Sequence, residues 1–245
     1  GGQAAVKDEL ESRSSYMKQI MAEREKFGPM IHDLARQIAS FQGKTIEHIT
    51  VFLAEVERRL ARLTDERMVL RGEQFAGQWP EKRLDAMREA AALHKELLNM
   101  LHTMDPEGEG WTARTNVRDE LLQVVEKFDA IRPQVDARVR GKEEVARRLA
   151  GERIPFDWSL INAIQLVAVT QARYVLAMML EAIHGLQQQM GDAAASKVEQ
   201  LAEQALRFAF RCHQFAGGFD QQTTELFSKL SAVISPPEAD ANADE

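Results

Sequence analysis

The stretch that decides the fold is residues 159–190, which read SLINAIQLVAVTQARYVLAMMLEAIHGLQQQM. Apolar side chains lie almost all the way round a helix of this sequence. Polar residues such as Gln165, Gln171 and Arg173 interrupt it too often for a membrane-spanning segment. At 1.5 Å per residue the helix would be about 48 Å long. We therefore predict a buried helix at the centre of a helical domain.

The N-terminal part of the chain shows helical spacing in two apolar stripes. The first stripe comprises Phe27, Ile31, Leu34, Ile38 and Phe41, with sparser positions upstream at Leu10, Met17 and Ile20. The second comprises Ile46, Ile49, Leu53, Val56, Leu60 and Leu63. Steps of three and four with Arg and Glu between them are typical of coiled-coil-like pairing, within the chain or with a second copy. Gly28-Pro29 should kink or interrupt the first of these helices.

Turn signals divide the rest of the chain into further helices. Pro80 stands where the first residue of a helix is favoured, and residues 105–110 (DPEGEG) are typical of a turn. The apolar spacing that follows predicts a long helix bent at Pro133, and later a helix from Val198 to Phe215. No stretch alternates apolar and polar residues as a half-buried strand would. The sequence predicts an all-α fold.

We expect an elongated multi-helix bundle with a long coiled-coil-like segment at its N-terminal end. Residues 1–72 are predicted to form that segment and to contribute to dimerisation. Residues 73–234 are predicted to form a helical bundle domain, and residues 235–245 a disordered acidic tail.

Charge and cysteine content exclude several classes of protein. The net charge of −7 argues against nucleic-acid binding, which needs a basic surface. Four acidic residues lie in the last eight positions, so the rest of the chain is close to neutral. Cys212 is the only cysteine, which excludes an internal disulfide framework and a cysteine zinc cluster. It falls on an apolar stripe and is expected to be an inert buried thiol.

Motifs that carry catalysis or cofactors are missing from the sequence. Glu181 and His184 have the spacing of a di-iron helix pair, but no second such pair exists. The six histidines form no metal-binding motif, and the chain has no phosphate-binding or nucleophile-elbow glycine motif. We therefore expect no enzyme activity, no cofactor and no metal, and binding or assembly is the remaining class.

Three stretches hold more charged and aromatic residues than a packed helix requires. They are residues 79–83 (WPEKR), 154–158 (IPFDW) and 207–220 (RFAFRCHQFAGGFD). Helix caps and core packing account for much of each stretch, whereas exposed side chains in them would suit partner binding, and both interpretations stay open for the third. The candidate partner-binding residues are Arg207, Arg211, His213, Gln214, Phe219, Trp79, Lys82 and Arg83.

These stretches resemble the C-terminal domain of the Chloroplast Unusual Positioning family of plants and algae. The match is carried by residues 207–211 (RFAFR), 213–220 (HQFAGGFD) and 79–82 (WPEK). It is supported by Leu84-Asp85, residues 88–91 (REAA), 11–15 (ESRSS) and 65–67 (DER), Val69-Leu70, Ile154-Pro155 and Asp157-Trp158. These segments occur along the chain in the same order as in the family, and the resemblance covers nearly the whole chain.

The resemblance implies a helical domain similar to the formin-homology-two domain of formins. It implies a homodimer that binds and nucleates actin and drives light-dependent chloroplast movement. It also implies a longer protein, held on the cytosolic face of the chloroplast outer envelope by a separate N-terminal anchor. An upstream proline-rich stretch of that protein would recruit profilin.

One departure from the family pattern keeps a second function open. The family is rich in lysine along the helix corresponding to residues 164–180, where this chain has Arg173 as its only basic residue. A loss of basic residues would weaken attraction to acidic actin. The alternative is a non-catalytic dimerisation or adaptor domain without actin activity of its own, with the link to microtubules that relatives outside chloroplast movement allow.

Overall fold

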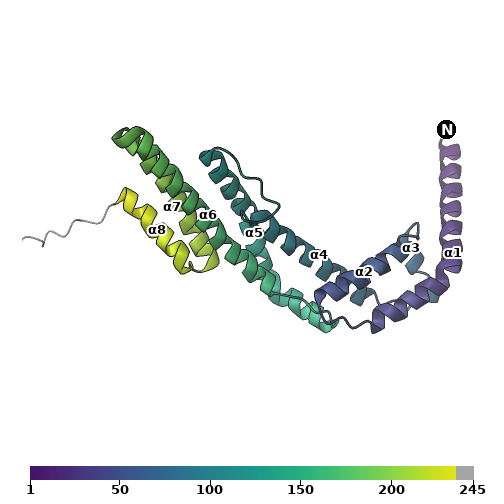
Figure 1. Ribbon diagram of the computed structural model, residues 1–245. Helices are drawn as coiled ribbons and strands as arrows, with labels where there is room; N and C mark the ends of the chain where they lie inside the picture. The colour runs from purple at the N-terminus through teal and green to yellow at the C-terminus, as the bar shows by residue number, and fades with distance from the viewer. Residues whose placement is uncertain (236–245) are drawn as a thin grey trace, which may run out of the picture. The chain divides into compact units, whose positions relative to one another are not determined.

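The computed structural model describes residues 1–235, and these form helices and no strand, as Figure 1 shows. The all-α prediction is confirmed. The predicted acidic tail lies outside the described residues, apart from Ser235. The elements are α1 (Gly2–Ser40), α2 (Ile46–Leu60), α3 (Glu66–Leu70), η1 (Glu73–Phe75), α4 (Glu81–Met104), α5 (Val117–Gly151), α6 (Ser159–Met190), η2 (Gly191–Ala194), α7 (Ala195–Ala216) and α8 (Gln221–Ile234).

The chain packs into two compact units, and neither unit is a continuous stretch of sequence. Unit 1 comprises Gly1–His94 with Glu143–Asp157, and unit 2 comprises Lys95–Lys142 with residues 158–235. Helices α4 and α5 therefore each contribute one part to unit 1 and another to unit 2.

Unit 1 is built on the two apolar stripes that the sequence shows. Ile31, Leu34 and Ile38 of α1 are buried, as are Ile49 and Leu53 of α2. Apolar burial of this kind supplies most of the stability of an amphipathic helix. Hydrogen bonds complete the ends of the short helices. Thr45 accepts from the backbone amide of His48 at the start of α2, and Asp65 does so from Met68 at the start of α3.

Proline residues lie inside two long helices. Helix α1 continues through Pro29, and Figure 1 shows it changing direction along its length, so the predicted kink is present and no interruption occurs. Pro29 lacks the amide that would bond to the carbonyl one turn earlier, which leaves the helix bent. Helix α5 likewise continues through Pro133 to Gly151, as the sequence predicts.

A buried arginine connects three segments of unit 1. Arg83, on the first turns of α4, is only 5% exposed. Its Nε donates to the carbonyl of Ile38 at 2.8 Å and its Nη1 to that of Glu152 at 2.5 Å, and its Nη2 donates to the carbonyl of Phe41. Because burial penalises the charged form, the pKa of Arg83 is lowered. One guanidinium thus joins α4 to the end of α1 and to the segment after α5.

Substitution of Arg83 should destabilise the protein. Arg83→Met leaves three carbonyls without their donor, and we expect the free energy of unfolding to fall by about 3 kcal/mol. Urea denaturation followed by circular dichroism measures the change. Lys82→Met, at the exposed neighbouring position, is the matched control and should change stability by less than about 0.5 kcal/mol. Equal effects of the two substitutions would contradict this role of Arg83.

Helix α6 is the central element of unit 2 and has the bounds that the sequence predicts. It packs against α7 and α8, which lie beside it in Figure 1. Its buried Gln171 donates from Nε2 to the carbonyl of Met104 at 2.9 Å. Within residues 1–235, the helical stretch 159–216 holds a window that could cross a membrane by length and composition alone. A core helix of a helical domain can have the same length and composition, and α6 packs against two helices as such a core helix does.

Phe128 of α5 lies at the centre of the contact between α5 and α7. Its ring is 5.5 Å from the ring of Phe208 and 5.5 Å from that of Phe215, edge-to-face in both cases. Cys212 lies on the same face of α7 and is fully buried, as predicted. Burial raises the pKa of its thiol far above the usual range, so the thiol stays protonated at neutral pH.

A buried carboxylate joins the start of α5 to α6. Glu120 is 1% exposed, and its Oε2 accepts from the hydroxyl of Tyr174 at 3.0 Å and from the backbone amide of Arg114 at 2.9 Å. The ring of Tyr174 also lies edge-on to Trp111. Burial, followed by the bond to Glu120, raises the pKa of Tyr174 to about 12.

Titration of Tyr174 should reveal this contact. In a Tyr16→Phe variant Tyr174 is the only tyrosine, and ultraviolet absorbance should show its phenol ionising at about 12 in the folded protein. In urea the pKa should return to about 10. Because the folded pKa is the higher one, the stabilisation from Tyr174 is complete below pH 10 and is lost as the pH rises toward 12. Ionisation near 10 without urea would contradict the contact.

Candidate functional site

Two hydrogen-bonded pairs show that α5 and α7 run in the same direction. Arg118 near the start of α5 donates from Nη2 to Oε1 of Gln200 at 3.2 Å. Arg211, about one and a half turns before the end of α7, donates to Asp129 of α5. In each pair the two residues are 82 positions apart along the chain, so α5 and α7 keep the same register at both places. Asn116 positions Arg118, because its Oδ1 accepts from the amide of Arg118 at 2.8 Å and caps α5.

A groove of about 420 Å³ lies along this pair of helices within unit 2. Leu121 and Phe208 are buried beneath it, while Leu122 is 55% exposed. We name it the α5–α7 groove. It is lined by Arg118, Leu121, Leu122 and Val125 of α5 and by Gln200, Gln204, Arg207, Phe208 and Arg211 of α7. The lining residues include three arginines and no carboxylate, so the groove is basic in a chain whose net charge is −7.

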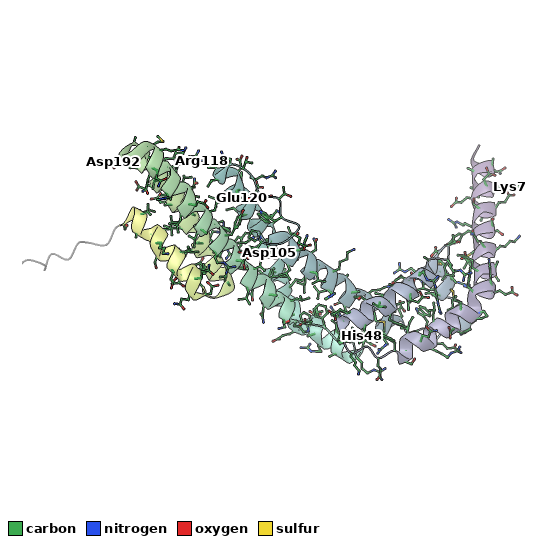
Figure 2. The ribbon with its side chains drawn as sticks, viewed as in Figure 1. Lys7, His48, Asp105, Arg118, Glu120 and Asp192 are labelled. Carbon is green, nitrogen blue, oxygen red and sulfur yellow. The ribbon has the colours of Figure 1, made fainter. Side chains whose placement is uncertain are left out.

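The three arginines of the groove differ in their contacts with other side chains. Arg211 is half-buried, pairs with Asp129 and lies 5.1 Å from the ring centroid of Phe128. Arg118, labelled in Figure 2 at the first turn of α5, contacts the neutral side chain of Gln200. Arg207 is exposed and has no hydrogen-bond or ion-pair partner among residues 1–235. Arg207 and Arg118 are therefore the basic groups available to a partner.

The other candidates of the 207–220 stretch lie away from this groove. His213 contacts Phe219 edge-to-face, with ring centroids 4.9 Å apart, and Phe219 also lies beside Phe227 of α8. Gln214 is exposed near the end of α7 and does not line the groove. Asp220 accepts from the amide of Thr223 and caps α8. His213 and Phe219 thus belong to the junction of α7 with α8.

The candidates near residue 80 belong to unit 1. Trp79 is half-buried and lines a second hollow, of about 550 Å³, together with Phe75, Leu84 and Arg88. Lys82 is exposed. Arg83 is buried with all its donors directed at backbone carbonyls, so its guanidinium does not lie on the surface where partner binding would need it.

Sequence reasoning missed Arg118 and Leu122 as candidate residues. Leu122 falls one position after Leu121, which belongs to the buried stripe of α5, so it lies off that stripe. The sequence did contain a signal for these two residues: Leu122 is a large apolar residue outside the core stripe, and the basic Arg118 precedes it by one turn. Its proximity to α7 could not be seen, because the partner residues lie about eighty positions away.

Arg211 and Arg207 should differ in their effect on stability. Arg211→Ala removes the pair with Asp129 and the contact with Phe128, and we expect it to lower the free energy of unfolding by about 1 kcal/mol. Arg207→Ala removes no such contact and should change it by less than about 0.5 kcal/mol. Urea denaturation compares the two variants with the parent. Indistinguishable midpoints would show that Arg211 has no structural role.

Comparison with known proteins places the chain in a family. The family described as "IPGAL1-like, C-terminal domain" matches residues 87–245, which include the whole α5–α7 groove. An uncharacterized protein of Arabidopsis thaliana is 29% identical over 237 residues, or 95% of this chain and 32% of that protein. The chain thus spans about a third of the length of this relative. Because the family match covers more than half of its residues, the chain belongs to the IPGAL1-like C-terminal domain family.

Proposed function

We propose that this domain is a non-catalytic module that binds actin and promotes the formation of short filaments for light-dependent chloroplast movement. The observation that carries the proposal is the basic lining of the α5–α7 groove on an acidic chain. A basic groove attracts an acidic protein surface such as that of actin and favours the encounter of the two. The resemblance to the Chloroplast Unusual Positioning family, and through it to formins, is the reason for proposing actin as the partner.

Nucleation of filaments in this way needs two copies of the domain. A dimer would hold actin subunits close together and raise their effective concentration, which removes much of the entropic cost of the first contacts. The N-terminal part of α1, where Figure 2 labels Lys7, carries an exposed apolar stripe that supports a homodimer. Its members Val6, Leu10, Met17 and Met21 repeat at steps of four, seven and four.

The wider setting of the proposal rests on the resemblance. The domain would act on the cytosolic face of the chloroplast outer envelope, held there by an anchor elsewhere in a longer protein. A proline-rich stretch of that protein would recruit profilin. The Arabidopsis relative, about three times as long as this chain, leaves room for such segments.

A second candidate function is an adaptor or dimerisation domain without actin activity, with a link to microtubules as a further possibility for its partner. The observation that favours it concerns Arg173, the only basic residue of 164–180. Its guanidinium pairs with Glu107 and with Asp220, both at 3.3 Å. This leaves α6 without a free cation along the segment that is lysine-rich in the resembled family.

The assembly of fluorescently labelled actin tests the proposal. Added domain should shorten the lag in a dose-dependent manner, with and without profilin. Arg207→Glu should lengthen the lag toward that of actin alone, because it reverses an unpaired charge of the groove without removing an internal contact. Arg140→Glu is the matched control, since it makes the same change at an exposed position of α5 outside the groove.

Two results would count against actin nucleation. A folded dimer, confirmed by light scattering, that leaves the lag unchanged would select the adaptor function. A lag that Arg207→Glu and Arg140→Glu lengthen equally would show that bulk charge, rather than the groove, is responsible.

A further inference from the structure

The α5–α7 groove has the layout of a receptor for a single helix. Its α7 wall runs from Gln200 to Arg211 in steps of four, three and four through Gln204 and Arg207. Eleven residues of helix at 1.5 Å each give a length of about 16 Å, or three turns. Two parallel helices leave a channel between their side-chain ridges, and an amphipathic helix packs into such a channel with anchors at i, i+3, i+4 and i+7.

The apolar part of the groove lies in its middle. Leu122 is 55% exposed, Val125 is half-buried beside it, and Phe208 lies beneath them. Leu122 is the only exposed apolar residue among those that line the groove, so an occupant would bury it first. Apolar anchors near the centre of a contact contribute most of the binding energy.

The charged part of the groove selects the sign of its occupant. Among residues 1–235 neither Arg118 nor Arg207 has a carboxylate partner, whereas Arg211 already has Asp129. Arg118 lies beside Gln200, and Arg207 is seven residues farther along α7, a separation of about 10 Å. A guanidinium without a carboxylate partner forms strong two-point hydrogen bonds with a carboxylate that approaches it.

We infer that the α5–α7 groove binds a three-turn amphipathic helix of the partner that carries two acidic residues about seven positions apart, flanking an apolar stripe. The inference rests on the proposed function for the identity of the partner, and it adds the site and the chemistry of recognition. The acidic residues pair with Arg118 and Arg207, and the apolar stripe packs on Leu122.

A designed peptide provides a direct probe. The probe is a fluorescein-labelled helical peptide of 14 residues, with leucines along one face and two glutamates seven positions apart beside them. Fluorescence anisotropy should show saturable binding to the whole domain. A second peptide with glutamine at both positions should bind at least about tenfold more weakly, because the two charge-assisted contacts are lost.

Variants of the groove locate the binding site. Arg118→Glu and Arg207→Glu should each weaken binding of the glutamate peptide about tenfold, and a lysine version of the peptide should recover binding to the double variant. Arg140→Glu should leave binding unchanged. Leu122→Ala should also weaken binding several-fold, whereas Leu166→Ala, at a similarly exposed leucine of α6, should not. Thermal melting confirms that each variant is folded.

Several outcomes would overturn the inference. Equal affinity for the glutamate and glutamine peptides would exclude charge recognition, and equal losses in Arg118→Glu and Arg140→Glu would exclude the groove. Dissociation of a dimer by Leu122→Glu would assign the groove to a second copy of the chain instead.

Actin assembly with the same variants separates this inference from the proposed function. Groove variants that lose the peptide but still nucleate actin as the parent does would refute the inference and leave the function standing. Specific peptide binding in a domain that never affects actin would support the site and refute actin as its partner.

Discussion

The packing of Phe128 against Phe208 and Phe215 is the contact on which the rest of unit 2 depends. It places α5 beside α7. The Arg211–Asp129 pair next to these rings and the Arg118–Gln200 pair nearer the helix starts keep one register along both helices. This register brings Arg118 near Gln200 and leaves Leu122 beside Phe208 in one groove. An aromatic core contact thus determines which surface residues lie together, although none of its three rings is exposed to a partner.

Much of the fold could be predicted from the sequence because it is encoded locally. Apolar steps of three and four along α1, α2, α6 and α7 identify each helix and the face that it buries, since helix periodicity depends on neighbouring residues. Asp220 could be recognised as a cap for the same reason, because a cap acts on the amide three residues later. Pro29 shows the limit of local signals, since the sequence left open whether the helix would bend or be interrupted there, and α1 continues past it. Pro133 lies within a helix that continues past it, as predicted.

The candidate site could be predicted only in part, because it depends on contacts between distant residues. Arg207 and Arg211 could be chosen as basic positions spaced one turn apart, and they do share the groove. The α5 residues that line the groove with them are about eighty residues away, and no local sequence pattern reports such a contact. Arg83 shows the opposite error, since its sequence suggests an exposed basic residue, while carbonyls 45 and 69 residues away surround its guanidinium.

The division of unit 1 into Gly1–His94 and Glu143–Asp157 affects the order in which the nascent chain can fold. The first segment leaves the ribosome long before the second, and the intervening residues 95–142 belong to unit 2. The carbonyl of Glu152 that Arg83 requires is therefore synthesised 69 residues after the arginine itself. During that interval α1 and α4 lack the contacts that the second segment later makes with Ala39 and Glu89. Early folding during synthesis thus favours a chaperone-bound or partly collapsed N-terminal segment over a finished unit.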